Sequence, residues 1–370
     1  MPFINDRLEQ TERERVETAR LADEDRGGAA DAAVPAEVGA VGIESRYHFD
    51  VDAIMAYVRR EILGQEEAVS ALERILRVVR ADISDPSRPL HTALFLGPTG
   101  VGKTEAVRSL ARALHGSAEA FCRVDMNTLS QEHYAAAITG APPGYVGSKE
   151  GITVLDQELI EGSLRKPGIV LFDELEKASD EVIEALLNVF DNGMLTVASG
   201  GRTYSFRNTL IFMTSNLGAR RLQRAAERRE RLPGKWFLPP RSRERERRIA
   251  EEELLARFSP EFVNRIDSIS VFDWLDGDTV DRLVDVELVR LNRRLAKHRV
   301  DLSLDQPVRQ RVIRFGYDRR FGARSMRRAF RHLIEAPLAN FLLTEPHPSD
   351  EPRSLLAVSV DSEVAFRPCG

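Results

Sequence analysis

The chain has 370 residues, of which 42% are apolar and 30% charged, with a net charge of −5. This composition suits a water-soluble protein of two or three domains and argues against bulk electrostatic affinity for nucleic acid or anionic lipid. No apolar run approaches the ~20 residues that cross a bilayer, and the first residues lack a secretory pattern. We therefore expect a cytoplasmic protein with no membrane or nucleic-acid partner, in which Cys122 and Cys369 are incidental thiols.

The first 45 residues are predicted to be a flexible tail. A charged run is followed by GGAADAAVPAEVGAVG, which has almost no large apolar side chain to bury. Charged terminal runs are usually only solvated, so a tail is the main interpretation. An arm that binds an adaptor is the alternative.

The middle of the chain, residues 46–275, predicts an α/β domain. Helical patterns begin at Val51 and at Gln65, and later ones cover 103–114 and 181–190. Five short apolar runs alternate with the helices and indicate strands at 92–96, 121–125, 169–173, 210–214 and 269–272. This alternation predicts a five-stranded parallel sheet with helices on both faces. A loop containing Gly200 and Gly201 is expected across 195–204.

After a junction near Asp273–Gly277, residues 276–370 predict a small, mostly helical domain. Long amphipathic patterns cover 279–299, 307–315 and 325–343, and short β-like stretches lie at 300–304 and 355–360.

A phosphate-binding loop follows the first predicted strand and opens a helix. Its residues are Gly97, Pro98, Thr99, Gly100, Val101, Gly102, Lys103 and Thr104. Backbone N–H groups of such a loop surround a β-phosphate, Lys103 adds a charge toward the β- and γ-phosphates, and Thr104 presents a hydroxyl to Mg²⁺. The sequence therefore predicts binding of ATP or GTP.

Polar residues at the ends of two further strands complete a hydrolytic site. Asp173 and Glu174 end an apolar strand, where Asp173 would hold Mg²⁺ partly through water and Glu174 would polarise the attacking water. Asn216 follows another strand and would orient that water or contact the γ-phosphate; by itself it would be assigned to a turn or helix cap.

Seven ordered segments carry a family resemblance over residues 60–345. They are ILGQEEAV (62–69), SDPSRPLHTALFLGPTGVGKTE (84–105), GAPPGYVGSKEG (140–151), LFDELEKA (171–178), FRNTLIFMTSNLG (206–218), FSPEFVNRID (258–267) and FGARSMRRA (321–329). The chain resembles the AAA+ ATPase module of the Clp unfoldases, above all the C-terminal module of ClpB, ClpA and ClpC proteins. The resemblance implies an ATP-hydrolysing homo-hexamer that remodels protein substrates.

The same resemblance assigns roles that spacing alone does not. It implies that Arg265 is an arginine finger reaching the ATP of a neighbouring subunit, and that Arg324 contacts the γ-phosphate from the small domain. The planar, permanently charged guanidinium suits both roles. Ile62, Leu63 and Gln65 match positions that contact adenine in the family.

Tyr145 lies in the segment Gly144, Tyr145, Val146 and Gly147, which follows two prolines and so predicts an exposed loop. Without the motif, packing in a core or interface would be the better interpretation. The resemblance implies instead that the loop lines a ring pore and grips a threaded polypeptide, for which an aromatic ring needs no sequence-specific partner.

A charged insert at 219–256 surrounds an apolar loop tip, Trp236, Phe237 and Leu238, bordered by prolines. The Ile-Gly-Phe or Ile-Gly-Leu tripeptide by which relatives dock a ClpP-type peptidase is absent from the insert, which argues against that partner. The loop tip or the N-terminal tail is a candidate for binding an adaptor. Arginines interleaved with glutamates indicate a solvated helix rather than a nucleic-acid site.

The leading hypothesis is therefore an ATP-driven unfoldase that threads polypeptide through a ring. The alternative is an ATP-dependent switch that assembles or disassembles a dedicated partner complex without threading. A third class, a nucleic-acid motor, is disfavoured by the negative net charge and the mixed-sign insert.

Overall fold

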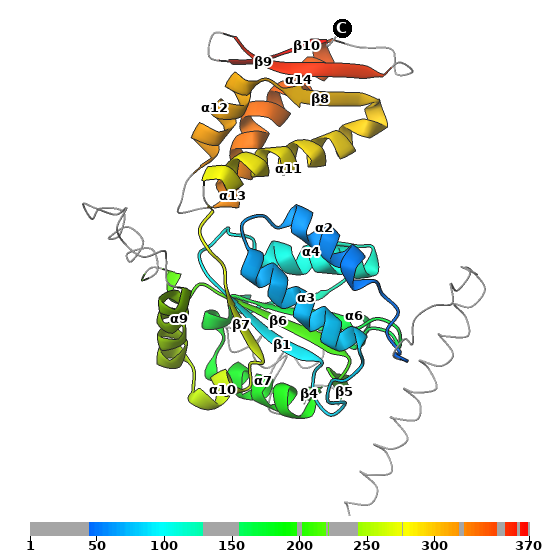
Figure 1. The fold of residues 1–370 in the computed structure, drawn as a ribbon, viewed down its shortest axis with the longest axis vertical. Helices are drawn as coiled ribbons and strands as arrows, with labels where there is room; N and C mark the ends of the chain where they lie inside the picture. Colours follow the sequence, from blue (N-terminus) through cyan, green and yellow to red (C-terminus); the bar gives the residue numbers. More distant parts are fainter. Residues whose placement is uncertain are drawn as a thin grey trace, which may run out of the picture.

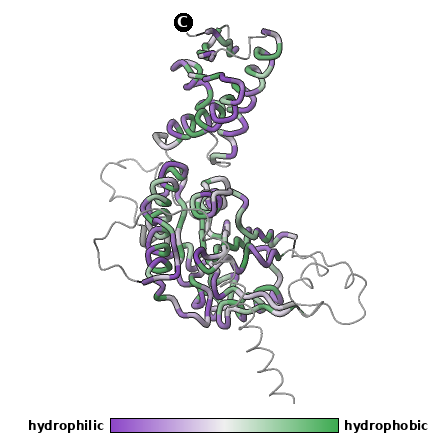
Figure 2. The backbone as a smooth tube through the Cα atoms, turned by 90° about the vertical axis from the view of Figure 1, so that its right-hand side faces the viewer, coloured by the Kyte–Doolittle hydropathy of each residue, from purple (hydrophilic) through white to green (hydrophobic). Residues whose placement is uncertain are grey.

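The computed structural model describes residues 44–128, 155–197, 202–219, 221, 243–275, 277–317, 322–345, 352–360 and 363–368. They form two lobes joined by one extended segment of chain (Figure 1). Figure 2 shows the same two lobes from the side, with hydrophilic and hydrophobic residues alternating along the helices as amphipathic packing requires.

The larger lobe is built on a five-stranded parallel sheet in the order β2-β3-β6-β1-β7. Its strands are β1 (His91–Leu96), β2 (Cys122–Asp125), β3 (Gly168–Asp173), β6 (Thr209–Ser215) and β7 (Ser268–Val271). Each lies within one residue of a predicted strand at both ends. The predicted α/β fold is thus confirmed.

Helices cover both faces of this sheet. They are α2 (Val51–Glu61), α3 (Glu66–Arg80), α4 (Lys103–His115), α6 (Gln157–Glu161), α7 (Asp180–Asn192), α9 (Arg243–Arg257) and α10 (Pro260–Asn264), with a 3-10 turn η3 at Leu175–Lys177. Alternate strand residues point to opposite faces: Phe95 packs with the core under α2, α3 and α4, and its neighbour Leu94 packs with the core under α6, α7, α9 and α10. Both faces are buried, which explains why the strands are continuous apolar runs.

Two strands appear where a loop was expected across 195–204. β4 (Met194–Val197) and β5 (Arg202–Ser205) pair antiparallel, with Leu195 opposite Tyr204. Both of these side chains are buried, so the ends of the segment belong to the core. Gly200 and Gly201 themselves lie outside the described residues, so the predicted loop there stays a prediction, and the β-branched and aromatic residues on either side favour the pairing.

The smaller lobe packs helices on a three-stranded sheet in the order β10-β9-β8. Its elements are α11 (Gly277–Leu295), a 3-10 turn η5 (Ala296–His298), β8 (Val300–Leu304), α12 (Gln306–Gly316), α13 (Ala323–Phe330), a π-helical turn η6 (Arg331–Glu335), α14 (Ala336–Thr344), β9 (Arg353–Val360) and β10 (Glu363–Pro368). The predicted helix over 325–343 is interrupted at η6, because Pro337 in the first turn of α14 lacks a backbone donor and the wider turn accommodates it. Among the described helices, none is long and apolar enough to cross a membrane.

The two lobes meet at a short segment after β7. Trp274 packs against the core of the large lobe, whereas Leu275 belongs to the core of the small one. Asp273, the residue before Trp274, is fixed to the large lobe by two hydrogen bonds from Gln65 at the start of α3. Gln65 Oε1 accepts from Asp273 N at 2.9 Å, and Gln65 Nε2 donates to Asp273 O at 3.0 Å. We call this fixed point between the lobes the pivot.

Candidate functional site

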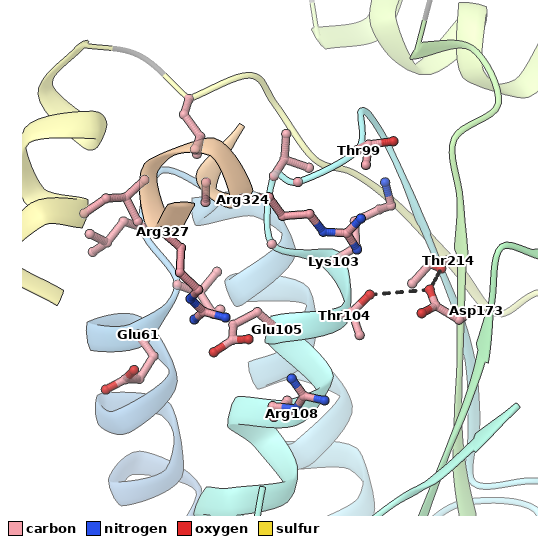
Figure 3. A pocket seen from close by; sticks show the side chains of 18 of the residues that line it. Glu61, Thr99, Lys103, Thr104, Glu105, Arg108, Asp173, Thr214, Arg324 and Arg327 are labelled. Carbon is pink, nitrogen blue, oxygen red and sulfur yellow. Dashed lines mark hydrogen bonds between the residues drawn. The ribbon is translucent and has the colours of Figure 1, made fainter. Parts of the chain in front are cut away.

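A cavity of about 360 Å³ lies between the two lobes, at the carboxyl ends of β1, β3 and β6 (Figure 3). Its wall includes the predicted phosphate loop from Thr99 to Thr104 on one side and residues of α11 and α13 on the other. Ligands of parallel α/β sheets collect at this edge, because the strands end there together and the loops that follow them converge.

Glycine is required at two points of the phosphate loop. Gly97 has φ +146°, and a Cβ there would lie 2.5 Å from the carbonyl oxygen of Phe272, so the loop passes directly against the end of β7. Gly102 has φ +109° and immediately precedes α4. These conformations let the chain turn from β1 into the N-terminus of α4, where unpaired backbone N–H groups and the helix dipole favour an anion.

Lys103 is folded back across the phosphate loop. Its Nζ donates to Gly97 O at 2.6 Å, to Pro98 O at 2.8 Å and to Asn216 Oδ1 at 2.9 Å, and the residue is 7% exposed. Burial is the main cause that lowers its pKa to about 8, although the carboxylates of Glu176 and Asp173 act in the opposite direction. A negatively charged group placed beside this ammonium, such as a phosphate, would favour its charged form.

Asp173 is the centre of a buried polar cluster. Thr214 donates its hydroxyl to Asp173 Oδ1, and Thr104 Oγ1 lies 3.4 Å from the same oxygen (Figure 3). Arg123, the second residue of β2, donates to Asp173 Oδ2 from Nη2 at 2.5 Å and from Nε at 3.1 Å. The sequence analysis did not single out Arg123; an arginine inside a short strand that pairs with the Asp173 strand was the available signal.

Glu174 adopts the left-handed backbone conformation, with φ +59° and ψ +51°, and its side chain lines the cavity. Its N–H donates to Thr214 Oγ1 at 3.1 Å, which holds the turn after β3. A non-glycine residue in this conformation is strained, and such strain is concentrated at functional sites.

Asn216 connects the loop to a carboxylate that the sequence analysis missed. Its Oδ1 accepts from Lys103, its Nδ2 donates to Glu176 Oε1 at 3.3 Å, and its side chain lines the cavity. Glu176 lies in the short helical turn after Glu174, and only that proximity in sequence could have indicated it.

An apolar wall closes the other end of the cavity. Ile62 and Leu63 contribute from the large lobe, and Leu275, Leu283 and Val286 contribute from the small one. This wall suits a flat aromatic base, which gains from losing apolar surface to both lobes. Gln65 and Pro98 lie beside the cavity rather than in its lining: the Gln65 amide holds Asp273, and the Pro98 carbonyl accepts from Lys103.

The small lobe also touches the phosphate loop directly. Ala323 N donates to Gly100 O at 2.8 Å, and Gly322 has φ +54°. The next residue, Arg324, lines the cavity and reaches to the side of Lys103 (Figure 3), whose pKa it also helps to lower. Two cationic side chains from different lobes therefore face the same space.

Arg265 is not brought to this cavity. It caps the C-terminus of α10 and forms an ion pair with Asp191 at 2.9 Å, and its side chain is 41% exposed. No other predicted site residue lies so far from the cavity among those that the structure describes. The predicted pore segment Gly144–Gly147 and the loop tip 236–238 lie outside the described residues, as do residues 1–43.

The chemistry of the donor set fits Mg²⁺. Thr104 and Asp173 offer a hydroxyl and a carboxylate, the hard oxygen ligands that this ion prefers. Within the described parts of the chain, no group of three or more His, Cys, Asp or Glu side chains gathers to hold a metal alone. The fit is therefore to an ion that takes its remaining ligands from phosphate and water.

Comparison with known proteins agrees with this geometry. The chain matches the model of the AAA domain (Cdc48 subfamily) over residues 88–269 and that of the C-terminal D2-small domain of ClpB over 275–352. A Pseudomonas aeruginosa protein named ATP-dependent protease ATP-binding subunit-like protein AmiB is 56% identical over 98% of both chains. A Rhodococcus erythropolis protein named ATP-dependent protease ATP-binding subunit-like protein is 39% identical over 99% of both. The chaperone protein ClpB of Pseudomonas putida is 42% identical over 77% of this chain, which corresponds to 31% of its own length.

The fold and the site define a nucleotide-binding AAA+ ATPase made of a large α/β domain and a small helical domain. The chain belongs to the Clp family of these ATPases and corresponds to a ClpB/ClpC-type module. The resemblance predicted from the seven sequence segments is confirmed.

Proposed function

We propose that this ATPase unfolds or remodels proteins by drawing polypeptide through the pore of a homo-hexameric ring. The observation that carries the proposal is the position of Arg265. The cavity has the groups needed to bind a nucleotide, but the arginine that the family motif assigns to hydrolysis lies on the surface, outside the cavity. An active site that lacks its arginine within one copy requires another copy to supply it.

Within one subunit, the chain's own residues bind and orient ATP. Backbone N–H groups of residues 99–102 and the N-terminus of α4 receive the phosphates, and Lys103 exchanges its contacts to the Gly97 and Pro98 carbonyls for phosphate oxygens. Ile62 and Leu63 hold the adenine against Leu283, while Gln65 acts beside them through the pivot.

Hydrolysis needs a base, an ion site and a cation on the γ-phosphate. Glu174 accepts the proton of the attacking water, and Asn216 orients that water. Thr104 and Asp173 would hold Mg²⁺, partly through water, and the ion would supply positive charge to the phosphates. Arg324 contacts the γ-phosphate from the small domain, and Arg265 does so from the neighbouring subunit.

The proposed substrates are proteins, gripped by the loop Gly144, Tyr145, Val146 and Gly147. Support comes from the sequence of that loop and from relatives named chaperone protein ClpB. The relatives that this chain matches over almost their whole length are named ATP-dependent protease ATP-binding subunit-like proteins. We nevertheless propose that no ClpP-type peptidase docks here, because the insert 219–256 lacks the docking tripeptide. Residues 1–45 or the insert would bind an adaptor in the cytoplasm.

The test is ATP-dependent unfolding of a stably folded, tagged fluorescent reporter, trapped after unfolding so that it cannot regain its signal. Wild type should abolish the fluorescence, and Tyr145→Phe should too, because it keeps the ring that grips the chain. Tyr145→Ala should bind and hydrolyse ATP without unfolding the reporter, and Glu174→Gln should bind ATP without either activity.

Two outcomes oppose threading. Full unfolding activity in Tyr145→Ala would contradict a gripping role for that ring. Robust ATP hydrolysis by wild type on many tagged reporters, with none of them unfolded, would favour the alternative, a switch acting on a dedicated partner complex. Capture of that partner on the Glu174→Gln protein in the presence of ATP would then identify the complex.

A further inference from the structure

Arg290, on helix α11 of the small domain, joins three carboxylates from three helices. Its Nη2 lies 3.0 Å from Glu61 Oε2 and 2.7 Å from Glu105 Oε1, and its Nη1 lies 3.1 Å from Glu287 Oε1. Glu61 ends α2 and Glu105 lies in the first turn of α4, both in the large domain, whereas Glu287 is one turn before Arg290 on α11. One guanidinium therefore bridges the two domains.

The bridge is largely removed from solvent. The side chains of Glu61, Glu287 and Arg290 are 8%, 13% and 22% exposed. Arg327 of α13 adds a second cation 3.3 Å from Glu287. Glu61 and Glu105 face the same part of the cavity from their two helices, with Arg327 beside them (Figure 3). Without Arg290, poorly hydrated carboxylates of both domains would face one another, and their repulsion would separate the domains.

The distance of Arg290 from the pivot makes this bridge sensitive to angle. For a rotation of the small domain about the segment beside Trp274, the lever arm is α11, which starts at Gly277. At 1.5 Å per residue, Arg290 lies about 20 Å along the helix, so a rotation of about 10° moves its guanidinium by roughly 3.5 Å. That movement breaks both ion pairs to the large domain, because they hold only at contact distance.

We propose that Arg290 is an ionic latch: a positioning residue that holds the small domain closed over the nucleotide cavity and thereby sets nucleotide affinity. The latch acts on the proposed ATP site without taking part in the chemistry. It engages the first turn of α4 through Glu105, one residue after Thr104, so the angle of the small domain and the placement of the phosphate loop change together.

Domain closure is measured directly, without nucleotide, by the distance between two spin labels. Labels at Val78→Cys on α3 and Leu343→Cys on α14 report on the two domains, since both side chains are exposed on helices. Cys369 is replaced by Ser, while Cys122 stays, because burial raises the pKa of its thiol and keeps it unreactive. Labelled protein is diluted into unlabelled protein so that distances arise within single subunits.

Arg290→Met should broaden the distance distribution and lengthen its mean, and ADP should bind about tenfold more weakly or worse, since the competent closed state is less populated. Arg294→Ala is the matched control: it lies one turn further along α11 and pairs with Glu335 inside the small domain, so both readouts should stay at wild-type values. The double variant Glu61→Gln, Glu105→Gln removes both large-domain carboxylates of the bridge, and reports the same distance change if Arg290→Met fails to fold.

Unchanged distances in Arg290→Met and in the double variant Glu61→Gln, Glu105→Gln would overturn the latch, and weaker ADP binding of Arg290→Met alone would then mean that Arg290 merely offsets negative charge in the cavity. Failure of wild type to bind ADP would refute the proposed nucleotide site, while the label distances would still decide the latch.

Discussion

Gly322→Ala tests whether the small domain must touch the phosphate loop for nucleotide to bind. A Cβ at Gly322 would lie 2.6 Å from Gly100 O and 2.8 Å from Gly100 C, and the backbone there has φ +54° and ψ −141°, a region that only glycine adopts readily. To restore van der Waals contact, α13 must withdraw by roughly 0.6 Å or more. This breaks the Ala323 N to Gly100 O hydrogen bond and moves Arg324 from the phosphates.

The cost to binding can be estimated from these contacts. Loss of the backbone hydrogen bond costs about 1 kcal/mol, and weakening a charge-assisted contact of Arg324 adds about 1–2 kcal/mol. Together they predict a loss of about thirty- to a hundredfold in affinity for an ATP analogue, at 1.4 kcal/mol per factor of ten. Isothermal titration calorimetry measures it, beside thermal unfolding of the nucleotide-free protein.

Gly116→Ala is the matched control, because it separates backbone strain from contact with the loop. Gly116 ends α4 with φ +83°, and a Cβ there meets nothing within 4 Å. The variant should lose about 1–2 kcal/mol of folding stability to left-handed strain and keep its nucleotide affinity. The reasoning is refuted if Gly322→Ala binds the analogue as tightly as wild type, or if Gly116→Ala weakens binding equally.

Three further predictions concern Glu174, Arg265 and Tyr47, a fully buried residue shortly before α2 whose hydroxyl donates to Asn208 Oδ1 at 2.7 Å. Glu174→Gln should keep ATP affinity and lose about 10²–10⁴ in turnover, measured by phosphate release, whereas equal loss of binding would mean a structural role. Arg265→Ala should lose about 10³ or more in turnover with ADP affinity unchanged; mixing it with Glu174→Gln should recover activity that neither has alone, and no recovery would contradict a finger acting between subunits. Burial raises the pKa of Tyr47 from its ordinary value of 10.0 to about 12. This difference contributes up to about 2.7 kcal/mol to the free energy of unfolding, which is fully present below pH 10 and is lost as the pH rises through 12. The free energy of unfolding in urea, measured between pH 8 and 12, should therefore fall more steeply with pH for wild type than for Tyr47→Phe. Parallel falls in the two proteins would contradict the raised pKa of Tyr47.

The strands of the large domain could be predicted because each is buried on both faces. Such strands are uninterrupted apolar runs, and glycine, proline and polar residues mark where they end. The edge strand β10 was missed for the opposite reason: in EVAFRP only Phe366 is buried, and the charged and proline residues beside it are typical of a loop. Pairing with β9, remote from any local pattern, makes it a strand.

The same distinction separates the site residues that were predicted from those that were missed. The phosphate loop, Glu174 and Asn216 each follow a strand directly and Asp173 ends one, and parallel strands place such residues together at one edge. Arg123 and Arg290 act through partners 50 and 185 residues away in the sequence, Asp173 and Glu105. Their spacing has no periodicity, because only the packing of strands and domains brings these charges together.

The ion pair between Arg265 and Asp191 fits the proposed transfer of the finger between subunits. Both side chains are about one-third exposed or more, so the pair contributes at most about 1 kcal/mol. A guanidinium that meets a phosphate in a water-excluded interface gains more, through two charge-assisted hydrogen bonds. Asp191 therefore holds Arg265 in a defined position in the single subunit without preventing its transfer. The α10 turn that carries Arg265 packs through Phe262 against Phe190 of α7, so the finger is presented from a rigid base. If Arg265 acts in this way, hydrolysis would be controlled by assembly, since closure over the nucleotide would occur within one subunit and the finger would arrive only with the next.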